Sequence, residues 1–264
     1  MTTQIKFGTS GWRAIVADEF TVANVRRAVT GIARYVASKN PAARLIVGRD
    51  PRYMGESFVD IAAEVLSAHG VQPLVIADPA PTPAIAYEIM RLRADGAINF
   101  TASHNPPEYN GIKFSTPDGA PALPEATQAI EKLVPQNDDD GKGSTAGKKR
   151  EIIDPKPAYL ARLKEIIELP LIRKSGLKVV FDPLWGAARG YSDDLLREAG
   201  VPVATVHDTR DVLFGGHAPE PDGPLLDEMR QRMKATGARL GIATDGDADR
   251  FGIVDEDGTF IQPN

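Results

Sequence analysis

Three evenly spaced aspartates follow a short apolar stretch near the end of the chain. They are Asp245, Asp247 and Asp249, within the segment Thr244–Arg250 that reads TDGDADR. In an extended loop, side chains at alternate positions point to one side, so the three carboxylates would converge. Converging carboxylates repel one another unless a cation neutralises them, and oxygen-only ligands suit a hard ion such as Mg²⁺ or Ca²⁺. The spacing therefore predicts a metal site.

An EF-hand calcium loop is the nearest alternative for this segment. Glu256 falls at the twelfth position counted from Asp245, as such a loop requires. The sixth position, which needs glycine for a sharp turn, is Arg250. The flanks at 241–243 and 251–254 are strand-like rather than helical. Both features argue against an EF-hand.

A serine stands at the end of another predicted strand. Residues Thr101–Pro106 read TASHNP and are followed by Asn110–Phe114, which read NGIKF. Ligand sites of α/β folds lie beyond the carboxyl ends of strands, so we expect Ser103 to be exposed there, with His104 beside it. On spacing alone, a Ser/Asn/Pro turn that only connects two strands is the simpler interpretation.

A glycine-rich segment near the start of the chain, Phe7–Arg13, reads FGTSGWR. Its backbone N–H groups could bind an anion, and Arg13 adds a bidentate donor for phosphate. Alone this signal is weak, because Gly-Thr-Ser-Gly is also an ordinary turn. Its spacing differs from that of the G-x-S-x-G nucleophile elbow.

A layered scaffold is needed to position these segments, and the rest of the sequence predicts one. Apolar residues recur with a helical period after Thr21, and short β-branched runs alternate with helical stretches. Further helices are predicted over Ser57–Gly70, Pro83–Leu92, Pro157–Glu168, Ser192–Ala199 and Leu225–Lys234, and strands over Arg44–Val47, Leu74–Ala77, Ala97–Thr101, Leu177–Phe181, Val203–Val206 and Leu240–Ala243. This alternation indicates the α/β class, with two similar three-layer α/β/α domains and mixed, largely parallel sheets.

The two halves of the chain also echo one another. Leu66–Pro73 and Leu196–Pro202 each end a predicted helix at a glycine suited to the left-handed C′ position, and a strand follows at once. Each stretch comes after a strand that ends in an aspartate, Asp50 or Asp182. We interpret this as a diverged internal repeat, although helix–glycine–strand units recur throughout α/β folds.

A polar segment, Gln136–Lys149, separates the two halves. It is rich in Asp, Gly and Lys, and its run GKGSTAGKK fails the spacing of a phosphate-binding P-loop. It therefore predicts an exposed linker. The expected domains are residues 1–150, with the serine loop, and residues 151–264, with the aspartate loop.

The composition limits the class of partner. The 264 residues carry a formal net charge of −5, are 42% hydrophobic and 25% charged, and include no cysteine. A general nucleic-acid binder would normally carry a basic face, so we expect no nucleic acid as partner. The apolar runs are only of strand length, and FGTSGWR follows no apolar leader, so we expect neither a membrane span nor secretion. The lack of cysteine excludes disulfides and fits a cytoplasmic protein.

Taken together, the motifs TASHNP with NGIKF, DGDADR and FGTSGWR resemble the active-site signatures of the α-D-phosphohexomutases, in the same chain order. Phe214–Pro221, which reads FGGHAPEP, resembles the H-x-P-E-P segment that precedes the metal loop of that family. The forms TASHNP and GTSGWR are more similar to phosphoglucomutase and phosphomannomutase than to phosphoglucosamine mutase. The family normally has four domains, so we expect this chain to hold domains I and II and to lack domains III and IV, as a fragment or a natural short form.

The resemblance implies an intramolecular phosphotransferase that interconverts hexose 1-phosphate and hexose 6-phosphate, of glucose, mannose or both, through a bound 1,6-bisphosphate. Ser103 would carry the phosphoryl group. One Mg²⁺ per chain would be held by Asp245, Asp247, Asp249 and the phosphate on Ser103. Glucose 1,6-bisphosphate would be the activator.

The resemblance also implies roles for the remaining motif residues. Arg13 and Arg250 would face the phosphoryl oxygens, and Asp249 would belong to the same phosphate site. His104 and Lys113 are both candidates for the general acid/base, and a lysine in that role would need a lowered pKa. The choice between them stays open at this point, as do the sugar preference and the oligomeric state.

Other interpretations of the function remain open. A fragment could bind Mg²⁺ and a phosphosugar without turnover, or the enzyme could be a phosphoglucosamine mutase. A metal-dependent phosphatase is less consistent. Such enzymes need an Asp nucleophile in a D-x-D pair near the start of the domain. In this chain, outside the linker and the turn at 255–257, such pairs occur only within the aspartate loop itself. Since the groups that hold the sugar would lie in domains III and IV, we expect this chain to fold but to turn over very slowly.

Overall fold

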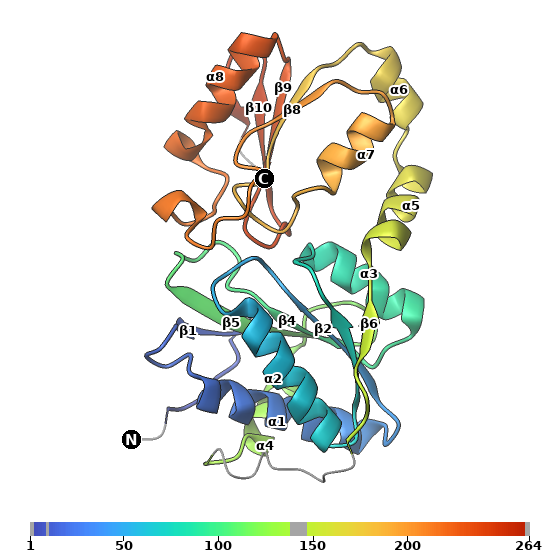
Figure 1. The fold of residues 1–264 in the computed structure, drawn as a ribbon, viewed down its shortest axis with the longest axis vertical. Coiled ribbons are helices and arrows are strands. Elements are labelled where there is room, and N and C mark those ends of the chain that lie inside the picture. Colours follow the sequence, from blue (N-terminus) through green and yellow to red (C-terminus); the bar gives the residue numbers. More distant parts are fainter. Residues whose placement is uncertain (1–2, 9–10, 138–146, 262–264) are drawn as a thin grey trace. The chain divides into compact units, whose positions relative to one another are not determined.

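The structure is a computed structural model that describes residues 3–8, 11–137 and 147–261. The chain forms two compact units, shown along the colour gradient of Figure 1. The first unit comprises Met1–Ala102 and Glu108–Pro155, and the second comprises Ser103–Pro107 and Lys156–Asn264. The short serine segment is therefore connected at both ends to the first unit but has its contacts in the second.

The first unit is built on a six-stranded sheet in the order β1-β5-β4-β2-β3-β6. Its strands are β1 (Trp12–Ile15), β2 (Arg44–Arg49), β3 (Gln72–Ile76), β4 (Ala97–Phe100), β5 (Tyr109–Ser115) and β6 (Glu151–Ile153). Strands β4, β2, β3 and β6 are parallel, whereas β5 is antiparallel to both β4 and β1. Its helices are α1 (Val22–Lys39), α2 (Gly55–Ala68), α3 (Thr82–Leu92) and α4 (Pro124–Leu133).

Alternation along β2 divides the core of this unit into two layers. Leu45 and Val47 pack with the apolar faces of α1, α2 and α4, whereas Ile46 packs with Ile85 and Ile89 of α3. Successive side chains of a strand point to opposite faces, so a continuous apolar run is what a strand covered on both sides requires. The sheet is thus the middle layer of an α/β/α sandwich.

The second unit is built on a five-stranded sheet in the order β11-β10-β9-β7-β8. Its strands are β7 (Val179–Asp182), β8 (Val203–Thr205), β9 (Leu240–Thr244), β10 (Phe251–Asp255) and β11 (Phe260–Ile261). Strands β9, β7 and β8 are parallel, and β10 is antiparallel to β9 and β11. The helices are α5 (Lys156–Ile166), α6 (Leu169–Lys174), α7 (Ser192–Glu198) and α8 (Asp227–Thr236), with 3₁₀ turns η2 (Phe214–Gly216) and η3 (Gly223–Leu226).

The two sheets share one topology. The order β5-β4-β2-β3 of the first unit corresponds to β10-β9-β7-β8 of the second, with the same strand directions. The junctions that echo in sequence also match, because Gly70 and Gly200 both have φ of +78°. The amide after each glycine donates to the carbonyl of Leu66 or Leu196, at 3.0 and 2.9 Å. The predicted α/β class with mixed sheets is confirmed, and the matching junctions agree with a diverged repeat.

Several shorter elements were not predicted. They include α4, which buries only Thr127 and Ile130, and the edge strands β6 and β11. Of the predicted linker Gln136–Lys149, residues 138–146 lie outside the part that the structure describes. Among the described residues, no helix combines the length and the apolar character needed to cross a membrane.

Candidate active site

The loop between β9 and β10 holds the three predicted metal ligands together. One carboxylate oxygen each from Asp245, Asp247 and Asp249 lies within 4.8 Å of the others. Asp245 and Asp247 are fully buried, and Asp249 is exposed. Burial, together with the neighbouring charges of Asp247 and Asp249, raises the pKa of Asp245 to about 7. These carboxylates destabilise one another, and an oxygen-only set of this size fits a hard divalent cation.

Asp245 also organises the backbone of this loop. Its Oδ1 accepts hydrogen bonds from the amides of Asp249 and Arg250, both at 3.1 Å. Ala248 has φ of +59°, a left-handed conformation that lets the chain turn back within a few residues. The backbone of the loop is therefore shaped around one carboxylate.

Other segments contact the candidate metal loop, residues Thr244–Arg250, at Gly246. Its amide donates to the carbonyl of Pro219 (3.2 Å), and its carbonyl accepts from the amide of Ala187 (2.9 Å). A Cβ at Gly246 would lie 2.6 Å from the carbonyl oxygen of Ser103 and 2.9 Å from a side-chain carbon of Pro219. Glycine is required here because the backbone of the serine loop approaches so closely.

Ser103 lies against the metal loop. Its hydroxyl donates a 2.8 Å hydrogen bond to Oδ2 of Asp245, and only 1% of the residue is exposed. The prediction that Ser103 is exposed is wrong, because its carbonyl packs on Gly246 and its hydroxyl on Asp245. Ser103 has φ of +54°, a conformation that is uncommon for residues with a Cβ and clusters at functional sites.

His104 and Arg250 belong to the same unit as Ser103. His104 follows Ser103 directly and is half-buried. Arg250 is exposed, and its Nη1 lies 3.3 Å from Oε1 of Glu220, within the FGGHAPEP segment. That segment therefore contacts the metal loop twice, through Pro219 at Gly246 and through Glu220 at Arg250.

Arg13 and Lys113 lie on neighbouring strands of the first unit. Arg13 is opposite Gly111 in the β1–β5 register, and Lys113 is two residues further along β5. Residues two apart share a face, so Arg13 and Lys113 are on the same face of the sheet. A Cβ at Gly111 would lie 3.0 Å from Cγ of Arg13, so the glycine leaves room for the arginine stem. Residues 9 and 10 of FGTSGWR are outside the described residues.

Two buried ionic clusters were missed at the sequence level. In the first unit, Asp50 accepts hydrogen bonds from the Thr101 hydroxyl (2.6 Å) and from Nε of Arg52 (3.0 Å). In the second unit, both carboxylate oxygens of Asp182 lie 3.0 Å from Nδ1 of His207. Each aspartate stands at a strand end and precedes a proline. This pair alone does not single out the clusters, because Asp-Pro also occurs at Asp78 and Asp154.

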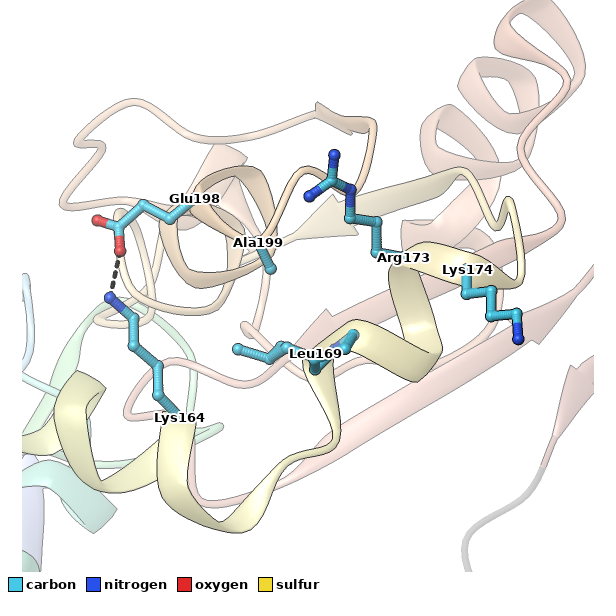
Figure 2. A pocket seen from close by; sticks show the side chains of 7 residues that line it. Lys164, Leu169, Arg173, Lys174, Glu198 and Ala199 are labelled. Atoms are coloured by element: carbon cyan, nitrogen blue, oxygen red, sulfur yellow. Dashed lines mark hydrogen bonds and ion pairs between the residues drawn. The ribbon is translucent and has the colours of Figure 1, made fainter.

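A separate groove of about 700 Å³ lies in the second unit (Figure 2). Its lining comes from α5, α6 and the end of α7. It includes Leu169, and Lys164 and Glu198 form an ion pair. None of the predicted site residues lines it. We therefore assign it no part in the chemistry of Ser103.

Comparison with known families agrees with this geometry. Residues 4–140 match the model of phosphoglucomutase/phosphomannomutase α/β/α domain I, and residues 157–258 match that of α/β/α domain II. The chain therefore belongs to the α-D-phosphohexomutase family, as its motifs predict.

Individual relatives carry different sugar names. A "Probable phosphoglucosamine mutase" of Methanosphaera stadtmanae is 36% identical over 261 residues, which are 96% of this chain and 55% of the relative. A "Phosphoglucomutase/phosphomannomutase" of Thermococcus kodakarensis is 36% identical over 262 residues, 97% of this chain and 56% of the relative. The crystal structure of a "putative phosphomannomutase" from Thermus thermophilus gives a TM-score of 0.91 at 32% identity, covering 100% of this chain and 60% of that one.

Two facts follow from these matches. The chain spans about half the length of the curated relatives it matches. The names of the relatives do not decide between glucose, mannose and glucosamine phosphates, because both kinds match at the same identity.

Proposed function

We propose that the two units carry the phosphoryl-transfer machinery of a phosphohexomutase, which interconverts hexose 1-phosphate and hexose 6-phosphate. The observation that carries this proposal is the 2.8 Å hydrogen bond from the Ser103 hydroxyl to Asp245, one of three convergent carboxylates. Enzymatic phosphoryl transfer depends mainly on positioning and on neutralising the charge of the phosphoryl oxygens. A serine beside a candidate metal site supplies both.

Asp245, Asp247 and Asp249 would hold one Mg²⁺, with an oxygen of phosphoserine 103 as a further ligand. When bound, the ion would neutralise the carboxylates and stabilise the charge of the transferring group. The raised pKa of Asp245 supports this assignment, because a group with a pKa of about 7 is only partly ionised at neutral pH in the absence of a cation.

The steps at Ser103 can be written from its own atoms. The Oγ–P bond of phosphoserine breaks as the phosphorus bonds to a hydroxyl oxygen of the sugar. The hydroxyl proton passes to a base, and the leaving Oγ of Ser103 takes up a proton. His104 and Lys113 are the proposed acceptors. The 1,6-bisphosphate then presents its other phosphate, whose bond to the sugar breaks as the phosphorus returns to Oγ of Ser103. Oγ gives up its proton as this bond forms, and the released sugar oxygen takes up a proton.

Two arginines are proposed to bind the phosphoryl oxygens. Arg250 has its guanidinium on Glu220, an exposed contact that a phosphate could replace at little cost. Arg13 is half-buried on β1 and offers the same bidentate donor. Asp249, which is the exposed member of the triad, would border this phosphate site.

The proposed substrates are hexose phosphates, with glucose 1,6-bisphosphate as the donor that primes Ser103. The TASHNP and GTSGWR forms favour glucose or mannose. Glucosamine phosphate is the second candidate, because relatives named phosphoglucosamine mutase match at the same identity. We place the activity in the cytoplasm, in keeping with a chain that has no cysteine.

The phosphoserine is tested by intact-mass analysis after incubation with Mg²⁺ and glucose 1,6-bisphosphate. We expect one added phosphate on the wild type and none on Ser103→Ala. Ser175→Ala, which changes an exposed serine of the same unit, is the matched control and should be labelled like the wild type. Equal labelling of Ser103→Ala would overturn the assignment.

The metal site is tested by calorimetric titration with Mg²⁺. Asp247→Asn should weaken binding by on the order of tenfold or more, since even residues that only orient ligands cost this much. Asp257→Asn, in the exposed turn after β10, is the control and should leave binding unchanged. A wild type that binds no Mg²⁺, with Ser103 phosphorylated or not, contradicts the proposed site.

A further inference from the structure

Arg52 is the largest fully buried side chain among the described residues. Its Nε donates to Oδ2 of Asp50 (3.0 Å), and its amide donates to Oδ1 of the same carboxylate (2.9 Å). Its Nη1 donates to the carbonyl of Tyr109 (3.0 Å). Oδ2 of Asp50 also accepts the hydroxyl of Thr101 (2.6 Å). These four residues lie in three separate segments of the first unit.

The segments that Arg52 joins are the two ends of the serine loop. Thr101 lies directly before residues 102–108, and Tyr109 opens β5 directly after them. Ala102 and Glu108 belong to the first unit, whereas residues 103–107 have their contacts in the second. The loop therefore leaves the first unit and returns to it at two points that one guanidinium–carboxylate pair connects.

A buried ion pair is a costly way to fill this space. Desolvation of both charges can exceed their attraction, and well-packed apolar side chains of similar volume are often equally stabilising. Apolar side chains lack direction, however. The planar guanidinium presents its donors at fixed angles, here to a carboxylate on one segment and to a carbonyl on another. The pair therefore supplies geometry that packing alone would not.

We infer that Arg52, held by Asp50, is a positioning residue for Ser103. It fixes the separation and the direction of the two ends of loop 102–108, and thereby keeps Ser103 at its φ of +54°. Such a conformation persists only where the surroundings determine it. Arg52 contacts neither substrate nor metal in this scheme and acts through the loop. The inference rests on the proposed function, because it concerns the serine assigned to phosphoryl transfer.

The test compares Arg52→Lys with Arg49→Lys. Both arginines are buried and paired with a carboxylate. The guanidinium of Arg49, however, pairs with Glu56 of α2 and donates to the backbone carbonyls of Ala77 and Asp50, not to Tyr109 at the end of the loop. Three quantities are measured: hydrogen exchange of the amides of residues 102–105, 108 and 109, the rate at which glucose 1,6-bisphosphate phosphorylates Ser103, and the Mg²⁺ affinity.

For Arg52→Lys we expect faster exchange in the loop, a phosphorylation rate lower by about 10²-fold, and unchanged Mg²⁺ affinity. Arg49→Lys should keep the wild-type exchange of the loop and the wild-type rate. If both variants lose the rate equally, or if Arg52→Lys keeps wild-type loop exchange, the inference is wrong. Should Arg52→Lys fail to fold, Thr101→Val removes one hydrogen bond of the same cluster, and its loop exchange and phosphorylation rate decide.

Failure of the proposed function gives a different result. A wild type that takes up no phosphate overturns the phosphoserine assignment, and with it any role of Arg52 in transfer. The exchange measurement needs no phosphate, so it still decides whether Arg52 restrains the loop.

Discussion

Asp50 in the first unit and Asp182 in the second occupy equivalent positions in two related sheets. Both are fully buried at the end of a central parallel strand, and both precede a proline. Each accepts a 2.9 Å hydrogen bond from the amide two residues later, that of Arg52 or Leu184. The parallel neighbour of each strand leads into a loop of the candidate site, β4 into the serine loop and β9 into the candidate metal loop. The two loops are thus topological equivalents.

The two units differ in how they neutralise this aspartate. In the first unit the cation is Arg52, inside the turn itself. In the second it is His207, which comes from beyond β8. Its ring lies 3.9 Å, centroid to centroid, from that of Trp185, with an angle of 33° between the ring planes. Nε2 of His207 also lies 3.0 Å from Oε2 of Glu228. An arginine keeps its charge at every physiological pH, whereas a histidine does not.

The pKa values of the second cluster follow from this arrangement. Burial lowers the pKa of His207, but the hydrogen bonds and charges of Asp182 and Glu228 outweigh burial and raise it above its usual value. Burial raises the pKa of Asp182, against the effect of His207. The buried charge of each aspartate is thus stabilised by the cation beside it. Only the cluster beside the metal loop can lose that cation near neutral pH.

The turn after Asp182 also contacts the metal loop directly. A Cβ at Gly186 would lie 2.9 Å from the carbonyl oxygens of Asp245 and Gly246, and the amide of Ala187 donates to Gly246. The Asp50 cluster holds the ends of a loop, whereas the Asp182 turn supports the body of one. The two equivalent turns share the aspartate but differ in the part of the neighbouring loop that they contact.

The largest expected effect is that of Arg52→Met, which removes the charge but keeps an apolar chain of similar length. Asp50 would be left as a buried carboxylate without its cation, so the free energy of unfolding should fall by about 3–5 kcal/mol. Urea denaturation at pH 7 measures this. The double variant Asp50→Asn, Arg52→Met should recover part of the loss. If Arg52→Met is as stable as the wild type, the guanidinium of Arg52 does not stabilise the buried charge of Asp50.

A smaller loss is expected for His207→Phe. A ring in contact with Trp185 is kept, but Asp182 loses the donor that lies 3.0 Å from both its oxygens. We expect a loss of about 1–3 kcal/mol in unfolding free energy at pH 6, measured by urea denaturation. A loss equal to that of Arg52→Met would mean that the two clusters are equivalent in energy as well as in position.

The scaffold and the convergence of the three aspartates could be predicted from the sequence for a clear physical reason. Helical and strand periods survive in the sequence, and three evenly spaced aspartates between apolar strands have no ordinary structural use. The prediction that Ser103 is exposed was wrong because its burial depends on a partner, Asp245, that is 142 residues away in the sequence. The clusters around Asp50 and Asp182 were missed because a lone aspartate before a proline is typical of any turn. Burial, which makes these aspartates unusual, is set by tertiary packing.

The pH dependence of the two clusters should differ. His207 has a raised pKa in the folded state, so its contribution is fully present below its unfolded pKa of about 6.5 and is lost as pH rises through the folded value. The stability difference between wild type and His207→Phe should therefore shrink between pH 6 and pH 9. The difference between wild type and Arg52→Met should stay constant over that range. Parallel curves for the two variants would contradict the contrast between a permanent and a titratable cation.

The smallest effect should come from the outer carboxylate of the second cluster. Glu228 lies in the first turn of α8 with 63% of its side chain exposed, so its ion pair with His207 is largely solvated. Glu228→Gln should lower the free energy of unfolding by less than about 1 kcal/mol at pH 6, and the loss should shrink as salt is added. The wild-type dependence on pH should survive in this variant, because Asp182 still binds His207. Urea denaturation at low and high salt measures both points, with Glu256→Gln, an exposed glutamate paired with Arg239, as the matched control. A loss as large as that of His207→Phe would mean that Glu228, rather than the buried Asp182, sets the charge of the histidine.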